Sequence, residues 1–233
     1  MRFKFKIPLL LAVLAVGVMG VSAASAWASN EFLAAKYPVL VKGVSANDQG
    51  FAIAGATTVC KKAEFHTGLE DGVNPTGPSL TLLIHPTYTK CEVELGGTHK
   101  ATVSTTGCNY VFMAAPELVS TTLEIECLAG KEIEVTVEGI TGCVIKVPPQ
   151  TVSGIEYMNL AGNIEVRAEV NDITWAATAG CGLAKSSGVE GEYREGEFNG
   201  AGEPVMAAAG HPAIGLAEGF EPLTKNKINI DVN

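Results

Sequence analysis

The sequence predicts an all-β fold, an antiparallel β-sandwich or a pair of small sandwiches, stapled by disulfides and preceded by a signal peptide. Apolar and polar residues alternate in several segments, most clearly in 123–127 and 133–137, which is the period of half-buried strands. Turn signals recur every ten or so residues, as in β domains without crossover helices. Six cysteines in an exported chain favour disulfides.

The first 28 residues have the layout of a secretory signal peptide. Basic residues precede an apolar run of 15 residues, 7–21, and small residues follow up to Ala28. We expect cleavage after Ala28, or after Ala26. The alternative is an uncleaved membrane anchor, but the apolar run is shorter than the roughly 20 residues that a spanning helix needs. No second apolar span follows in the sequence, so no stable membrane span is expected after cleavage.

The domain organisation follows from the same signals. The expected boundaries are 1–28 for the signal peptide, 29–203 for a secreted β domain that forms one unit or two subdomains (37–115 and 118–203), and 204–233 for an irregular C-terminal segment. The alternation of Ile228, Ile230 and Val232 suggests a last edge strand within that segment.

The charge balance of the mature chain excludes two classes of partner. Residues 1–28 hold three basic and no acidic side chains, so 13 Lys and Arg remain against 25 Asp and Glu, a net charge of −12. Nucleic acids and anionic membrane surfaces both require a basic footprint. We therefore expect an extracellular ligand or protein as the partner.

The first half of the mature chain reads as strands joined by turns. Residues 51–54 and 57–65 are predicted as two strands separated by a glycine, and 80–84 as a strand that ends before Pro86. Between them, residues 67–79 carry three glycines, two prolines and an Asn-Pro step, which predict a long loop. A loop of this length is a candidate contact surface for a protein.

The most regular stretch is predicted to be a hairpin. If residues 128–130 form a three-residue loop, Ile125 lies opposite Ile133, and the apolar residues of both strands share one face. Beyond it, Pro148 and Pro149 must lie at an edge or a crossover, because proline cannot donate to a β-ladder.

Two further elements are expected near the C-terminal end of the β domain. Residues 164–170 alternate, and the alternation changes phase at 171–172 before it continues to residue 177. Residues 188–200 are rich in glycine and glutamate and are predicted as a hairpin with outward glutamates.

The cysteine spacing favours disulfides over a metal site. Successive cysteines are 31, 17, 19, 16 and 38 residues apart, without the C-x-x-C pairs of a zinc site. A hairpin that pairs Tyr110 with Ile125 also places Cys108 opposite Cys127, at a separation suited to a disulfide.

Two sets of pairs fit the spacing. The preferred set is Cys60/Cys91, Cys108/Cys127 and Cys143/Cys181, which joins neighbours in sequence. A competing set joins Cys91 to Cys108 and Cys127 to Cys143, and it fits hairpins nearly as well. The preferred set gives every cysteine a structural role.

Five segments together carry a resemblance to known proteins. They are YPVLVKG (37–43), VCKKAEFHTG (59–68), HPTYTKC (85–91), TTGCNYVF (105–112) and EIECLAG (124–130). They resemble a group of uncharacterised secreted actinobacterial β-rich proteins. The resemblance covers most of residues 37–200 and implies export and a β fold, with no established activity.

No metal or cofactor site is predicted. The four histidines are scattered and are interpreted as surface or loop residues, namely His66, His85, His99 and His211. Glu64, His66, Glu70 and Asp71 cluster near the long loop, but the alternating acid-and-glycine pattern of a calcium loop is absent. A solvated acidic loop is the favoured interpretation.

No catalytic residue is predicted either. The chain lacks a G-x-S-x-G motif. A carboxylate pair for glycoside hydrolysis could come from the glutamates of 188–200, which are Glu190, Glu192, Glu195 and Glu197. Outward charges on an exposed hairpin are the simpler explanation. Trp175, the only tryptophan of the mature chain, is expected in the core rather than on a sugar-binding surface.

These observations favour a secreted or envelope-associated structural or ligand-binding β module. Two alternatives belong to other classes: an extracellular hydrolase that uses Asp and Glu side chains, and an inhibitor that binds a protein through residues 67–79. A cleft with two inward carboxylates would favour the hydrolase.

Overall fold

The computed structural model describes residues 31–34, 37–67, 74–115, 118–160, 163–198, 204–205 and 228–230, so the expected signal peptide lies outside the described residues. The described chain is all-β, as predicted, and its one helical element is the short 3-10 turn η1 (Ala179–Cys181). The strands are β1 (Phe32–Ala34), β2 (Lys42–Val44), β3 (Asp48–Ile53), β4 (Ala56–His66), β5 (Thr81–Glu94), β6 (Thr98–Ser104), β7 (Cys108–Met113), β8 (Thr121–Cys127), β9 (Ile133–Val137), β10 (Val144–Val147), β11 (Gln150–Leu160), β12 (Asn163–Ala177), β13 (Ser187–Phe198), β14 (Pro204–Val205) and β15 (Ile228–Ile230).

The main sheet closes into a barrel, so the predicted sandwich is wrong. The order β5-β7-β8-β11-β12-β13-β3-β4 returns to β5 through a long antiparallel pairing of β4 with β5. Alternation specifies one buried face per strand, and both architectures satisfy it, so the pattern could not separate them. Strands from 37–115 and from 118–203 share this one closed sheet.

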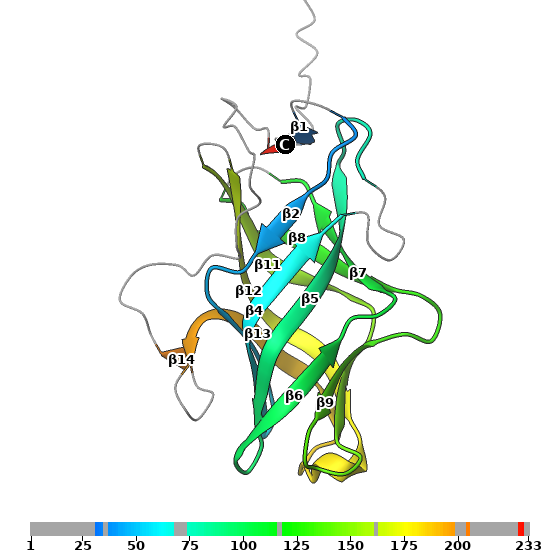
Figure 1. The fold of residues 1–233 in the computed structure, drawn as a ribbon, viewed down its shortest axis with the longest axis vertical. Coiled ribbons are helices and arrows are strands. Elements are labelled where there is room, and N and C mark those ends of the chain that lie inside the picture. Colours follow the sequence, from blue (N-terminus) through cyan, green and yellow to red (C-terminus); the bar gives the residue numbers. More distant parts are fainter. Residues whose placement is uncertain are drawn as a thin grey trace, which may run out of the picture.

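One wall of the barrel is built in two tiers (Figure 1). The upper tier is β7, β8 and β11, and the lower tier is β6, β9 and β10. Strands β5 and β12 run through both tiers and pair with a different neighbour in each. The chain changes tier at 105–107, at 128–132 and at Pro148-Pro149, which confirms the crossover predicted for the two prolines.

The predicted hairpin over 123–137 is wrong in its pairing. Strand β8 pairs with β7 and β11, whereas β9 pairs with β6 and β10. Residues 128–130 form a turn between the tiers instead of a hairpin loop. The Lys131 N–H donates to the Leu128 carbonyl at 2.9 Å, which closes the turn. The Leu128 N–H donates to the Gly107 carbonyl, in the neighbouring segment that changes tier, at 2.8 Å. Local alternation names the buried face of a strand and not its partner.

Strand β5 continues through Pro86, against the prediction that it ends there. Residues Thr81–Ile84 pair with β7 and Cys91–Glu94 pair with β6, so Pro86 falls in the gap between the two tiers. A proline is tolerated there because no strand on that side requires its missing N–H. The Thr105 hydroxyl donates to the Pro86 carbonyl at 2.6 Å and fills the gap.

Strand β13 is one continuous strand, so the hairpin predicted over 188–200 is also wrong. It pairs with β12 on one side and with β3 on the other. The phase change predicted at 171–172 is confirmed, since the register of β12 shifts between Val170 and Ile173. The strands predicted around Gly55 are confirmed as β3 and β4.

Three disulfides cross-link the barrel, and they are the three pairs that the sequence analysis preferred. Cys60–Cys91 joins the two closing strands, Cys108–Cys127 joins β7 to β8, and Cys143–Cys181 joins the start of β10 to η1. Cys108 and Cys127 are directly opposed, in the register that pairs Tyr110 with Ile125. Three disulfides are compatible with an extracellular location.

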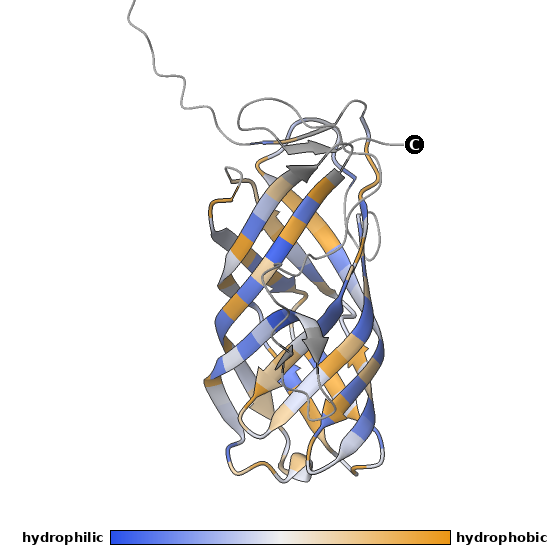
Figure 2. Cartoon of the chain, turned by 90° about the vertical axis from the view of Figure 1, so that its left-hand side faces the viewer, coloured by the Kyte–Doolittle hydropathy of each residue, from blue (hydrophilic) through white to orange (hydrophobic). Residues whose placement is uncertain are grey.

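Apolar and polar residues alternate along the strands (Figure 2), and most of the apolar ones are buried in the barrel. The lower end is filled by Trp175, Val93 and Ile145, each at most 1 % exposed, which confirms the core position of Trp175. At the upper end Phe32 of β1 packs edge-on against Tyr157, with ring centroids 5.8 Å apart. Both ends of the barrel are therefore covered by large side chains.

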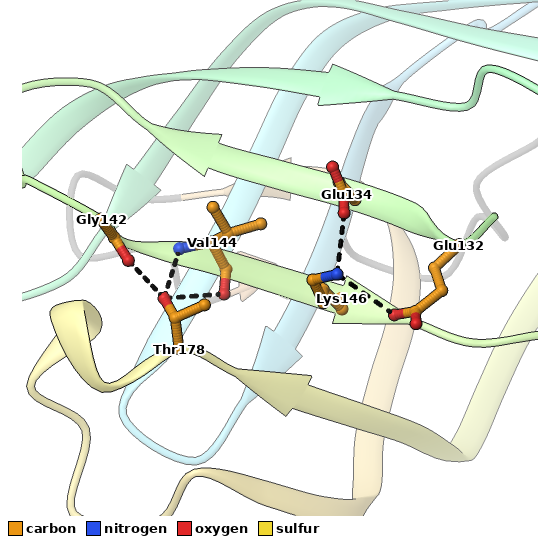
Figure 3. A network of polar contacts seen from close by, with 6 residues as sticks. All are labelled: Glu132, Glu134, Gly142, Val144, Lys146 and Thr178. Atoms are coloured by element: carbon orange, nitrogen blue, oxygen red, sulfur yellow. Dashed lines mark hydrogen bonds and ion pairs between the residues drawn. The ribbon is translucent and has the colours of Figure 1, made fainter. Parts of the chain in front are cut away.

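Polar contacts hold the lower tier to the end of β12 (Figure 3). The Thr178 hydroxyl accepts the Val144 N–H at 2.9 Å and donates to the Gly142 carbonyl. On the outer face of the same strands, Lys146 forms ion pairs with Glu134 at 2.9 Å and Glu132 at 3.9 Å. Exposed pairs of this kind contribute little to stability, so the Thr178 bonds are the structural link.

Candidate functional site

The barrel interior encloses a cavity of about 100 Å³. Its walls come from both tiers and from the strands opposite them, and they are almost entirely apolar. Leu123, Ile125, Ile133 and Val135 all line it, so the shared apolar face predicted for these residues is confirmed although their strands do not pair. Protein interiors have few voids larger than a water molecule, which makes this cavity the leading candidate site.

Five polar side chains interrupt the apolar lining: the hydroxyl of Thr58 on β4, and a group of four where β3, β5, β7 and β13 meet the cavity. The hydroxyls of Tyr88 and Tyr110 are hydrogen-bonded at 2.9 Å. The Tyr193 hydroxyl donates to Gln49 Oε1. The Gln49 amide in turn donates to the backbone carbonyl of Asn47 at 3.0 Å, which fixes its orientation. Glu195 lies opposite Gln49 in the neighbouring strand. We call Gln49, Tyr88, Tyr110, Tyr193 and Glu195 the polar cluster.

The tyrosines of the polar cluster stay protonated. Burial raises the pKa of the Tyr110 hydroxyl to about 12. Burial also raises the pKa values of Tyr88 and Tyr193 well above their usual range. At neutral pH all three therefore present neutral hydroxyls that can donate or accept a hydrogen bond.

Glu195 is the most unusual member of the polar cluster. It is 5 % exposed and lies directly opposite Gln49 in the register of β13 and β3. Neither carboxyl oxygen receives a well-aligned hydrogen bond, because the hydroxyl of Tyr193, which lies close to the carboxyl group, donates its proton to Gln49. Burial raises the pKa of Glu195 to about 9; the Tyr193 hydroxyl opposes this rise and the Glu165 carboxylate adds to it. Glu195 is therefore a neutral acid at pH 7.

Two of the other predicted glutamates lie apart from Glu195. Glu190 and Glu192 are exposed and form ion pairs with Lys185 at 2.7 Å and Arg194 at 3.3 Å. The side chain of Glu197 lies outside the described residues. Glu195 is the one Asp or Glu among the described side chains that is buried, so these residues bring no inward carboxylate pair together.

The outward prediction was wrong for Glu195, and a pattern in the sequence could have revealed its inward position. Gly191, Tyr193 and Glu195 share one face of a continuous strand. A tyrosine two residues before a glutamate places the glutamate on the tyrosine's face. The predicted hairpin placed a turn within this segment, so the alternation was not followed from Tyr193 to Glu195.

The remaining candidates lie apart from the cavity or outside the described chain. Glu64 is partly exposed and forms an ion pair with Lys62 at 2.7 Å, while Glu70 and Asp71 lie outside the described residues. His85 is buried in β5 with Nδ1 3.0 Å from the Cys108 carbonyl oxygen, so the surface assignment was wrong for it. His66 and His99 are partly exposed on strands, and His211 is not described.

The described residues contain no group of three His, Cys, Asp or Glu side chains arranged to hold a metal ion. No helix in the described part of the chain has the length and apolarity to cross a membrane.

No family model, curated protein or solved structure matches the chain. The resemblance to secreted actinobacterial proteins stays a prediction.

Proposed function

We propose that the protein is a secreted or envelope-associated barrel that binds a small, mainly apolar ligand in its cavity. The observation that carries the proposal is the apolar cavity itself, about 100 Å³ in an otherwise close-packed interior. A cavity of roughly 150 Å³ lined by aliphatic and aromatic residues is known to bind benzene. A single aromatic ring or a short aliphatic chain is therefore the size of ligand that this barrel suits.

The polar cluster supports binding rather than a purely structural role. Ligand pockets combine apolar walls with a few convergent polar groups that orient the ligand. Glu195 costs folding free energy because its carboxyl group is buried without a partner. A protein that only needed a filled barrel would be more stable with an apolar residue at this position.

Hydrolysis through paired carboxylates has less support. Such a mechanism requires two carboxyl groups on either side of the scissile bond. The described residues bring only Glu195 into the interior. The inhibitor alternative depends on the loop 67–79, of which residues 68–73 lie outside the described chain.

Titration calorimetry of the mature protein with toluene tests the proposal. We expect saturable one-site binding to the wild type and binding at least about tenfold weaker in Val152→Phe, whose ring would fill the cavity. Thr151→Phe is the matched control, since Thr151 is exposed on the same strand. If Val152→Phe does not fold, Ala168→Leu replaces another lining residue.

Two results would overturn ligand binding in the cavity. One is the absence of any heat of binding for toluene and for other small apolar molecules. The other is equal affinity in wild type, Val152→Phe and Ala168→Leu, which would place binding elsewhere.

A further inference from the structure

Aromatic rings form much of the cavity wall. They are Phe51, Phe65, Tyr88, Tyr110, Phe112 and Tyr193. The face of an aromatic ring carries negative charge density and attracts a cation within a few ångströms. An apolar wall made of rings therefore suits a positively charged organic group better than a wall of aliphatic side chains does.

Glu195 supplies an acidic group beside two of the lining residues, without an ion-pair partner among the described residues. Tyr193, two residues earlier on β13, and Gln49, opposite on β3, both line the cavity, so Glu195 borders it through them. The titratable groups around Glu195 are Tyr193 on its own strand, Tyr88 and Tyr110 on β5 and β7, and Glu165 on β12. None of them is basic, and the cation next to Glu165, Arg167, is already paired with Glu165 at 2.6 Å.

The nearest basic residue in sequence does not compensate Glu195. Arg194 contacts Glu169 at 3.8 Å and Glu192 at 3.3 Å, both exposed, on the outer face of the barrel. Buried carboxyl groups are normally hydrogen-bonded or paired. The described residues supply no such partner to the oxygens of Glu195, which points to a partner from outside them.

We propose that the ligand carries a primary ammonium group on its small apolar body, and that Glu195 is its counter-ion. This inference rests on the proposed function, whose cavity receives the body of the ligand. The aromatic rings surround the cationic end, and the tyrosine hydroxyls accept its remaining N–H groups. The net charge of −12 expected for the mature chain favours the approach of a cation.

An amine and a neutral ligand differ in their proton balance. Free Glu195 is protonated at neutral pH, because burial raises its pKa to about 9, and a primary ammonium ion is also protonated in solution. When the two form an ion pair, the Glu195 proton leaves to solvent and the ammonium keeps its own. Affinity for an amine therefore rises about tenfold per pH unit between pH 6 and 8, whereas affinity for a neutral ligand stays flat.

Calorimetry with benzylamine, benzyl alcohol and toluene tests this inference. We expect benzylamine to bind with release of one proton, measured as a difference in heat between two buffers of different ionisation enthalpy. In Glu195→Gln its affinity should fall about thirtyfold or more and lose its pH dependence. Glu192→Gln, the same change at an exposed site of β13, should behave as wild type.

The three ligands separate this inference from the proposed function. If toluene or benzyl alcohol binds in the cavity while benzylamine does not, or binds without proton release, the amine assignment is wrong and the cavity remains a binding site. If none of the three binds, the proposed function itself fails. The proton-release measurement uses only the wild-type protein, so it does not depend on the folding of Glu195→Gln.

Discussion

Replacement of Glu195 by glutamine should change how the stability of the barrel depends on pH. The buried carboxyl group has a pKa of about 9 in the folded protein, against 4.5 in an exposed chain. Between these values the folded protein holds a proton that the unfolded chain has released. Stability contributed by this group is therefore lost as the pH rises from about 4.5 towards 9.

The size of the effect follows from one proton. The free energy of unfolding falls by about 1.4 kcal/mol per pH unit inside this window, or about 2.7 kcal/mol between pH 6 and 8. Glutamine has nearly the same shape and does not titrate. The stability of Glu195→Gln relative to wild type should therefore increase by the same amount over that range.

Urea unfolding at pH 6, 7 and 8, with the disulfides intact, measures this difference directly. All other titrating groups are common to both proteins and cancel in the comparison. Glu192→Gln is the control, and its difference from wild type should be flat because Glu192 is exposed. A Glu195→Gln difference that does not change with pH would refute the assignment of Glu195 as a buried neutral acid.

Three further outcomes follow from the packing of the barrel. Gly154→Ala should lower the free energy of unfolding by about 2 to 4 kcal/mol in chemical denaturation, because the φ of Gly154 is +100° and an added Cβ would lie 2.0 Å from the Glu169 carbonyl oxygen. Gly130→Ala is the control: with a φ of +75° and open space around it, this change should lower the free energy of unfolding by only about 1 kcal/mol. Tyr157→Phe should lower stability by about 1 kcal/mol, since the buried hydroxyl donates to the Met113 carbonyl at 3.0 Å, and an unchanged denaturation midpoint would show that this bond contributes nothing. Reduction of the three disulfides should lower the melting temperature, since each closes a loop of 19 to 38 residues and contributes about 3 to 4 kcal/mol in the entropic model; equal melting curves with and without reductant would exclude this.

Features set by neighbouring residues could be predicted from the sequence. The register that opposes Cys108 and Cys127 depends on one short connection and on alternation in two adjacent strands. Pro148 and Pro149 could be assigned to a crossover because proline cannot serve a ladder on both sides. In each case the determining interaction lies within a few residues.

Features set by distant pairing could not be predicted in the same way. Closure of the barrel depends on β4 with β5 and on β13 with β3, and the latter strands lie far apart in sequence. Strands β8 and β9 have the alternating pattern expected of a hairpin, yet they pair with strands of different tiers and not with each other. A period of two fixes which face is buried and leaves open which strand lies beside it.

The candidate site could not be predicted from the sequence for the same reason. Glu195 belongs to a glutamate-rich segment whose charge favours an outward assignment, and only its pairing with β3 places it opposite Gln49 inside the barrel. The tyrosines of the polar cluster come from three strands, β5, β7 and β13, and no spacing in the chain unites them. Their convergence is a property of the closed sheet.

Methyl NMR of the mature protein during a toluene titration tests most directly whether the barrel interior is a binding site. We predict saturable shifts for the methyl groups of Val152, Ile155 and Ile125, which line the cavity, and no shift for Val189, which is 62 % exposed. The affinities read from the three lining residues should agree. Shifts that are confined to exposed methyl groups such as Val189, or that fail to saturate, would contradict the account.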